Sequence, residues 1–426
     1  MMLQKKYMRG GQFMGAISCS DSSDGFRGKE NAGGIKKQPR KAFRMRFLPI
    51  LLLFLVFLWA HVAGAADVKL TPKLAVGGAY DDNLFLSVDD KLSSSIITVS
   101  PRVELDYQTL LSSFLLTADW DILSYLDESD LDRTNQYYRL SGDHRIKERW
   151  DTSAEFKYYN DTTLNTYLQE TGRVIDRVER DFLEAGGKVS YNITNISRIA
   201  AGYQYQNTKY ENDIYSDYDT HRGSLYYSHR LKNEIDTFSV GPSYYHRSND
   251  FNDVDSFALN FGWKRDWSDI TNSDASIGAR YTNVKRDDGT EDDKWGAKAK
   301  FDFTYAGIVS TTTFRYFHDL RTTADGDDVN VDNFYLTYRR SITERFGAGI
   351  NGRLVFSYKL LNQDSDINDE RYYWVEPRLF YQLTENLDLS LRYRYQNNVE
   401  FRDEGDQTRE RNIVWLQLSY GFPILM

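Results

Sequence analysis

Acidic residues gather in several short runs along the chain, and carboxylates in such runs are ligands that calcium prefers. The run closest to a calcium-binding loop is Asp325-Gly326-Asp327-Asp328, so Asp325, Asp327 and Asp328 are candidate calcium ligands. None of the runs has the full spacing of an EF-hand loop. The alternative is a solvated surface, where divalent ions bridge carboxylates to the phosphates of lipopolysaccharide. The sequence leaves both interpretations open.

Arginine and lysine recur at every second position of runs whose other positions are apolar. If these runs are strands in a membrane, the charged positions must face water, because Arg or Lys against lipid costs about 2–4 kcal/mol near the midplane. Rings of basic side chains in a pore favour anions. The candidates for lining such a lumen are Arg102, Arg139, Lys188, Arg280, Lys298, Arg315, Arg339, Arg353, Arg378, Arg392 and Arg394. The alternative is a network of cross-strand ion pairs with little selectivity.

The longest segment between two alternating runs covers residues 161–179. Its apolar residues need a place in which to be buried, and the inside of a wide barrel would provide one. This segment is therefore a candidate for narrowing a pore. The candidate constriction residues are Leu164, Tyr167, Leu168, Arg173 and Arg177. The alternative is a segment that lies over the rim of the barrel.

Histidine is the remaining residue type that could carry catalysis, and five histidines follow residue 66: His144, His221, His229, His246 and His318. His246 and His318 stand near acidic runs, but no nucleophile motif accompanies them. We therefore predict no catalytic residue and no enzymatic activity. The chain also has no phosphate-binding loop, and its basic residues alternate along strands, so no nucleic-acid partner is expected.

Strands must position these residues, because the apolar pattern has period two. Leu387, Leu389 and Leu391 alternate with Asp388 and Ser390, which indicates a strand with two unlike faces. Runs of this kind, about ten residues long, recur from residue 68 to the end of the chain. Their number and their aromatic ends are typical of a membrane-spanning barrel rather than of a soluble sandwich.

Short turns and long loops alternate between the runs. Eight turns and nine loops join eighteen predicted strands, and sixteen or twenty would require only one hairpin to be divided differently. The predicted fold is all-β, a transmembrane antiparallel up-and-down β-barrel, with both termini on the turn side in the periplasm. Four prolines, Pro72, Pro101, Pro242 and Pro377, share the phase of the apolar face. We expect bulges or strand ends at these prolines, because proline lacks the N–H that a ladder requires.

The N-terminal part has the features of a secretory leader. An apolar run at residues 47–59 follows basic residues and precedes Ala63-Gly64-Ala65, so we expect cleavage near residue 65 or 66. Residues 1–66 then form an N-terminal extension with a signal peptide, and residues 67–426 form the barrel. Removal of the leader takes away the only cysteine, Cys19, and shifts the formal net charge from −9 to −17. The mature protein would have neither thiolate metal ligands nor cysteine nucleophiles.

A local motif adds a family resemblance. Gly78-Ala79-Tyr80-Asp81-Asp82-Asn83-Leu84-Phe85-Leu86, followed by Ile96 to Tyr107 with its Ser-Pro step, resembles the opening of the β-barrel porin type 2 proteins. These include outer-membrane β-barrel proteins associated with exopolysaccharide and exosortase gene clusters. The resemblance covers residues 68–107 and implies an outer-membrane barrel that assists an extracellular polysaccharide. It supplies no catalytic residues.

Together these observations favour a pore in the outer membrane of a Gram-negative bacterium, serving exopolysaccharide export or the passage of anionic solutes. The alternative is a surface-binding or structural barrel with acidic, calcium-binding extracellular loops and no open pore. The expected partners are outer-membrane lipid, lipopolysaccharide, the barrel-assembly machinery and an extracellular polysaccharide. No cofactor is expected other than calcium at the acidic loops.

Overall fold

The computed structural model describes residues 66–426 apart from 165, 166, 174–176, 213, 214, 325, 327, 361–368, 423 and 426. The first half of the barrel comprises β1 (Asp67–Asp81), β2 (Ser94–Gln108), β3 (Ser112–Tyr125), η1 (Ser129–Leu131), β4 (Arg133–Lys147), β5 (Trp150–Thr162), α2 (Tyr167–Thr171), β6 (Glu179–Asn192), β7 (Ser197–Tyr210), β8 (Tyr218–Arg230) and β9 (Asp236–Asn249). The second half comprises β10 (Asn252–Ser268), β11 (Thr271–Arg286), β12 (Glu291–Ala306), β13 (Ser310–Thr322), β14 (Asp328–Ser341), β15 (Phe346–Lys359), β16 (Asp369–Thr384), β17 (Leu387–Phe401), β18 (Gln407–Gly421) and β19 (Ile424–Leu425). The predicted leader lies outside the described residues.

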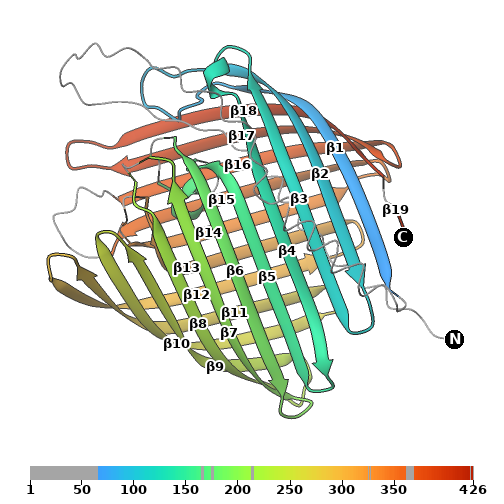
Figure 1. The fold of residues 1–426 in the computed structure, drawn as a ribbon. Coiled ribbons are helices and arrows are strands. Elements are labelled where there is room, and N and C mark those ends of the chain that lie inside the picture. Colours follow the sequence, from blue (N-terminus) through green and yellow to red (C-terminus); the bar gives the residue numbers. More distant parts are fainter. Residues whose placement is uncertain are drawn as a thin grey trace.

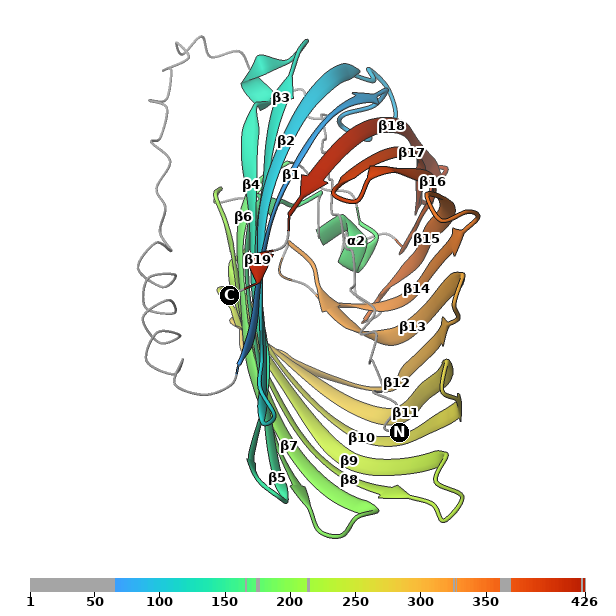
Figure 2. The same cartoon turned by 90° about the vertical axis from the view of Figure 1, so that its right-hand side faces the viewer.

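The described strands form one closed antiparallel barrel (Figures 1 and 2). Each strand pairs with the next along the chain, and β18 returns to pair with β1 from Lys73–Gly421 to Asp81–Ile413. The two-residue β19 continues beside β1, where Leu70 lies opposite Ile424. The prediction of eighteen strands is confirmed. Closure leaves no unpaired edge, which is what a sheet needs inside a hydrocarbon layer.

The outer wall is apolar, as the alternation predicts. Val76, Phe257, Ile277 and Trp295 expose between 47% and 70% of their surface, although water would disfavour such exposure in a soluble protein. Each of β1 to β18 has 13–17 residues, more than the 9–11 that a tilted strand needs to cross the hydrocarbon core. The protein is therefore a membrane-spanning β-barrel of the outer-membrane type. None of its described helices has the length and apolar character needed to cross a membrane.

The expectation of bulges or strand ends at the prolines is wrong. β1 continues through Pro72, and β2, β9 and β16 likewise continue through Pro101, Pro242 and Pro377. The sheet instead loses its pairing locally on one side: Pro101 pairs with Leu74 of β1, while no pairing with β3 is present at that position. The register resumes unchanged beyond each gap, because one missing N–H donor removes one ladder bond without shifting the strand.

Candidate functional site: the lumen

The segment between β5 and β6 lies inside the barrel, where Figure 2 shows α2 in the space enclosed by the strands. Leu168 of α2 is fully buried against Val329, Val355 and Tyr372 on the inner faces of β14, β15 and β16. The neighbouring Gln169 binds the same wall through its side-chain amide. Its Oε1 accepts hydrogen bonds from Trp374 Nε1 at 2.7 Å and Arg353 Nη1 at 3.1 Å, and its backbone oxygen accepts one from Asn333 at 3.2 Å. Apolar burial and hydrogen bonds together fix this segment across the lumen.

The predicted constriction residues of this segment are mostly buried. Leu164, Tyr167 and Leu168 are each at most 2% exposed, so their apolar surface is covered within the barrel. Arg173 lies 3.4 Å from Glu370, and Arg177 donates a hydrogen bond to the backbone oxygen of Leu131 at 3.0 Å and stacks over Tyr125. The basic residues of the segment thus hold it to the wall rather than line an opening.

A second inward segment follows β1 at residues 82–93 and is called the first loop below. Its Leu84 is buried among Tyr125, Ile413 and Trp415, while Leu86 reaches the buried cluster that contains Leu168. The first loop and the α2 segment therefore meet inside the barrel. Among the described residues, these two segments cover the inner face from β13 to β18 and extend onto β1 to β3, and Tyr167 of α2 also packs with Tyr210 and Tyr218 at the loop ends of β7 and β8.

A buried ion pair fixes the first loop at the seam of the barrel. Asp81 ends β1 and accepts two hydrogen bonds from Arg411 Nε of β18, at 2.9 and 3.0 Å, with a further bond from Arg411 Nη2. Asp81 is 0% exposed and Arg411 1% exposed. Asp82 receives hydrogen bonds from the backbone and side chain of Asn412, and the Asn83 side chain donates to the backbone oxygens of Ser87 and Glu410. The Tyr-Asp-Asp-Asn-Leu motif therefore has a structural role, which is to hold the first loop against β18.

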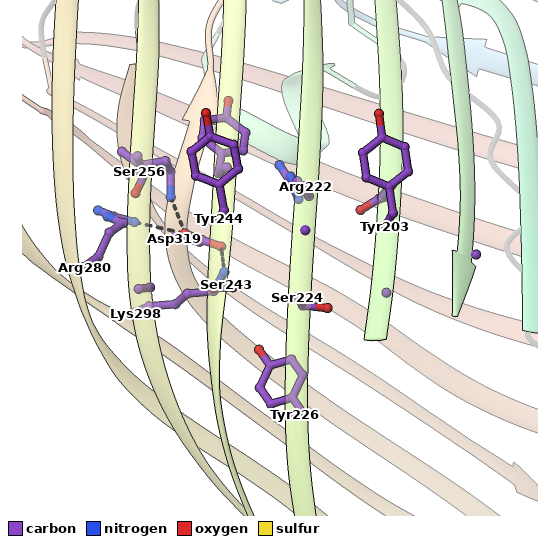
Figure 3. A pocket seen from close by; sticks show the side chains of 17 residues that line it. Tyr203, Arg222, Ser224, Tyr226, Ser243, Tyr244, Ser256, Arg280, Lys298 and Asp319 are labelled. Atoms are coloured by element: carbon purple, nitrogen blue, oxygen red, sulfur yellow. Dashed lines mark hydrogen bonds and ion pairs between the residues drawn. The ribbon is translucent and has the colours of Figure 1, made fainter. Parts of the chain in front are cut away.

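The opposite side of the lumen is open and charged (Figure 3). A cavity of about 340 Å³ lies along the inner faces of β7 to β13. Its charged lining consists of Arg222, Arg280, Lys298 and Asp319. Asp319 accepts hydrogen bonds or ion pairs from Arg280 and Lys298, both at 2.9 Å, while Arg222 stacks over the Tyr245 ring at 5.2 Å. The lining thus holds three cations and one carboxylate, so this cavity has a formal surplus of positive charge.

A second cavity, of about 310 Å³, continues the first toward α2. It lies between Glu170 and Thr171 of α2 and the inner faces of β5 to β9. Gln204, Arg222 and Tyr245 line both cavities, so the two spaces adjoin at these residues. A solute that passes beside α2 along this wall would meet the Arg222 guanidinium in both cavities.

The alternation and the strand register place all eleven predicted basic residues on inward-facing positions, but they form no single ring. The structure brings Arg280 and Lys298 together at Asp319, and it brings four of the arginines together on β14 to β17. The others are dispersed: Arg102 lies 3.2 Å from Asp119, Arg139 donates to Tyr159 Oη at 2.9 Å, Arg315 lies 3.8 Å from Asp302, Lys188 is exposed, and Arg353 binds Gln169.

Sequence analysis missed Arg222, the cation shared by both cavities. Leu225 and Tyr227 of β8 are outward-facing and 49% and 42% exposed, so their phase would have placed Arg222 on the inner face. This sequence pattern in β8 is a weak indication that Arg222 faces inward, because Tyr226 interrupts the apolar–polar alternation with an inward aromatic ring. Asp319 was also missed, because its strand alternates aromatic residues on both faces.

The candidate calcium site receives no support from its described part. Asp325 and Asp327 lie outside the described residues. Asp328 is buried, with Arg247 Nη2 3.2 Å from one carboxylate oxygen and Thr322 Oγ1 donating to the other at 2.8 Å. Both oxygens are thus engaged by protein donors. Across the part of the chain that the structure describes, no group of three or more His, Cys, Asp or Glu residues could hold a metal ion.

The five histidines lie on the outer wall. His246 and His318 each lie 3.0 Å from an aspartate of the next strand, Asp255 and Asp332. Two other histidines lie within hydrogen-bonding distance of serines. Ser112 Oγ is 2.8 Å from Nδ1 of His144, and Ser197 Oγ is 2.9 Å from Nδ1 of His229. Within residues 66–426 as described, the histidines beside serine have no carboxylate partner and those beside carboxylate have no serine.

Comparison with known proteins assigns neither a family nor a function to this chain. No family model matches the sequence, and no curated protein matches it. Solved structures similar to this chain include Pseudomonas aeruginosa OccK2 (OpdF), with 12% identity over 85% of this chain and 99% of that chain and a TM-score of 0.43. Acinetobacter baumannii OccAB3 has 12% identity over 84% of this chain and 100% of that chain, with a TM-score of 0.41. The Pseudomonas aeruginosa outer membrane protein opdK has 11% identity over 84% of this chain and 99% of that chain, with a TM-score of 0.39. At these scores no solute or family is carried over.

Proposed function

We propose that the protein is an outer-membrane pore that prefers anionic solutes. The observation that carries the proposal is the open side of the lumen, where Arg280 and Lys298 pair with Asp319 and Arg222 adds a third cation to the same cavity. A low-dielectric wall with a surplus of one sign of charge concentrates counter-ions of the other sign. Basic side chains in a constricted pore therefore raise the passage of anions relative to cations.

The path of such solutes runs beside α2 rather than through the centre of the barrel. α2 and the first loop occupy the β13 to β18 side, while the two adjoining cavities lie along the β5 to β13 side. The second cavity is balanced in charge, since Lys157, Arg222 and Arg321 face Glu155, Glu170 and Glu184 there. Preference for anions is therefore expected to arise in the first cavity.

Export of an acidic exopolysaccharide is the more specific form of this proposal. It rests on the resemblance of residues 68–107 to outer-membrane barrels associated with exopolysaccharide clusters. The motif itself packs at the barrel seam and lines neither of the two cavities described above, so it supports the barrel rather than glycan contact. A polysaccharide with carboxylate groups would suit the same basic lining as a small anion.

A closed structural or surface-binding barrel is the alternative, and the two inward segments favour it. Leu86 and Leu168 belong to one buried cluster, so the α2 segment and the first loop brace each other across part of the lumen. If the path beside α2 is too narrow for hydrated ions, the barrel would be shut. The acidic loops would then be its functional surface.

Single-channel recording in planar lipid bilayers separates these functions. Refolded protein in a potassium chloride gradient is expected to give discrete conductance steps and a reversal potential of the sign that chloride selectivity requires. A reversal potential of the opposite sign would contradict the anion preference. Absence of conductance in protein that is folded, as judged by heat-modifiable electrophoretic mobility, would favour the closed barrel.

A further inference from the structure

Three arginines form one row across neighbouring strands of the inner wall. Arg339 of β14 lies opposite Gly349 of β15, Gly349 lies opposite Arg378 of β16, and Arg378 lies opposite Arg392 of β17. Trp415 of β18 ends the row beside Arg392. Arg378 and Arg392 are thus like charges directly opposite each other, an arrangement that destabilises a sheet.

Three carboxylates act on the row: the charge of Asp388 acts on Arg339, the charge of Asp121 acts on Arg392, and Glu376 is already engaged. Glu376 accepts a hydrogen bond from Arg394 Nε at 2.8 Å and forms an ion pair with Arg394 Nη2 at 2.5 Å. The charges of Arg378 and Arg392 also act on Glu376. Arg392 is 8% exposed, and its Nη2 has no hydrogen-bond partner among the described residues. The Nε of Arg378 is likewise buried without a partner there. With Arg394 included, four arginines face these three carboxylates, so the cluster keeps one surplus positive charge together with unused donors.

Two of these guanidinium groups stack face-on against aromatic rings. Arg339 lies over Phe380 at 4.1 Å and Arg392 over Trp415 at 5.1 Å. Stacking of this kind uses the face of the guanidinium and leaves its edge donors for a planar oxyanion. Between Arg339 and Arg378, the absence of a side chain at Gly349 gives room: a Cβ there would lie 3.1 Å from Arg378 Nε.

The row lies on the turn side of α2. On β15, Arg353 contacts α2 through Gln169, and Gly349 stands four residues nearer to the turn that precedes the strand. Four residues of strand span about 13 Å. The turn side is the side predicted to face the periplasm, so a ligand that enters from there would meet the row before it meets α2.

We propose that Arg339, Arg378 and Arg392 form an oxyanion-binding site on the lumen wall for a carboxylated or phosphorylated ligand. The inference deepens the proposed function and rests on it in one respect, namely that the ligand reaches the row through a water-filled lumen. Charge-assisted hydrogen bonds from several arginines bind carboxylate and phosphate alike, so the site is defined by this shared chemistry. Its ligand source is decided by experiment.

Equilibrium titration of the full barrel in detergent micelles tests the site, with trigalacturonate and inorganic phosphate as the two probes. The double variant Arg339→Gln/Arg378→Gln is expected to bind the preferred probe about 10- to 100-fold more weakly, since a hydrogen bond to a charged group contributes roughly 1.5–3 kcal/mol. The matched control, Arg139→Gln/Arg315→Gln, removes two inward arginines from other parts of the wall and should bind as the unmodified protein does.

Tighter binding of trigalacturonate than of phosphate, lost in the row variant, supports the site and assigns it to an acidic glycan. The reverse order supports the site and assigns it to phosphorylated solutes. If neither probe binds, or if the control loses as much affinity as the row variant, the proposal is overturned. If the double variant does not fold, the single variant Arg339→Gln decides, because this side chain is exposed and its loss removes little packing.

The binding test of the arginine row and the conductance test of the pore can fail independently of each other. A barrel that conducts anions while neither probe depends on the row would overturn the site and leave the pore. A barrel that binds a probe through the row without conducting would retain the site and overturn the pore.

Discussion

The two sides of the lumen differ although the same alternation builds both. On the β14 to β16 side, the inward residues near the loops include Val329, Val331 and Val355, all of which are fully buried beneath α2. On the β8 to β10 side, the inward residues in the middle of the strands include Ser224 and Ser243, which line an open cavity, and only near the loops does an inward valine, Val254, pack in an apolar cluster. One side of the lumen is therefore largely a hydrophobic core beneath α2, whereas the middle of the other side is a polar wall beside a cavity.

The difference shows that a wide barrel needs apolar inward residues wherever it holds a segment inside. A lumen of this size is too wide for the wall side chains to fill. The chain instead inserts α2 and the first loop, which pack against inward valines and are held in addition by buried ion pairs such as Arg173 with Glu370. Where no segment is inserted, charged and hydroxyl side chains remain hydrated. Four predictions probe this contrast, and they begin with the largest expected effect.

Asp81→Ala should destabilise the packed side most. The change leaves the fully buried Arg411 without its bidentate carboxylate, and removing one partner of a buried pair costs about 3–5 kcal/mol. Urea unfolding in lipid vesicles measures the loss. The matched control, Asp89→Ala, removes an exposed aspartate of the same loop and should change the stability little. Equal stability of the two variants would contradict the role given to the buried pair.

Leu168→Ala should cost about 2–5 kcal/mol, because it opens a cavity between α2 and the inner wall. The expected readout is earlier hydrogen exchange in α2, measured by mass spectrometry, together with lower resistance to urea. Leu110→Ala, at a fully exposed turn position, serves as the control with the same loss of volume. Unchanged exchange in α2 would show that this side is not held by apolar packing.

Replacing residues 164–176 by a short Gly-Ser linker should increase single-channel conductance, because it removes the segment that crosses the lumen. Shortening the exposed loop at residues 287–290, between β11 and β12, should leave the conductance as it was. An unchanged conductance in the first variant would mean that α2 does not limit the path of ions.

Arg222→Gln should lower the ratio of anion to cation permeability by up to about fivefold, since a unit charge at 4 Å in water-like surroundings is worth about 1 kcal/mol. The effect should shrink as salt concentration rises, because ions screen the charge. Lys209→Gln removes one positive charge from an exposed position on the outer wall and should not change the ratio. Reversal potentials in salt gradients measure both variants. Equal shifts in the two variants would rule out a specific role for Arg222.

The candidate site could be predicted only in part. The alternation placed Arg339, Arg378 and Arg392 on the inner face, because apolar residues of their strands, such as Leu336, Leu379 and Leu391, take the opposite phase. Their meeting in one row depends on how β14 to β17 are registered, and the spacing along the chain does not specify that register. Arg222 escaped prediction because Tyr226, an inward aromatic residue of its own strand, obscures the phase.

The sequence by itself determined the barrel: period-two alternation sets which face of each strand meets lipid, and the alternation of turns and loops favoured eighteen strands, with sixteen or twenty left open until the structure decided. Only the tertiary structure decided which parts of the lumen are filled and which charges become neighbours. The physical reason is that lipid exposure is a local property, which each residue carries in its own polarity. Contacts such as Asp81 with Arg411, or Gln169 with Trp374, join residues more than 200 positions apart, and only closure of the barrel brings them together.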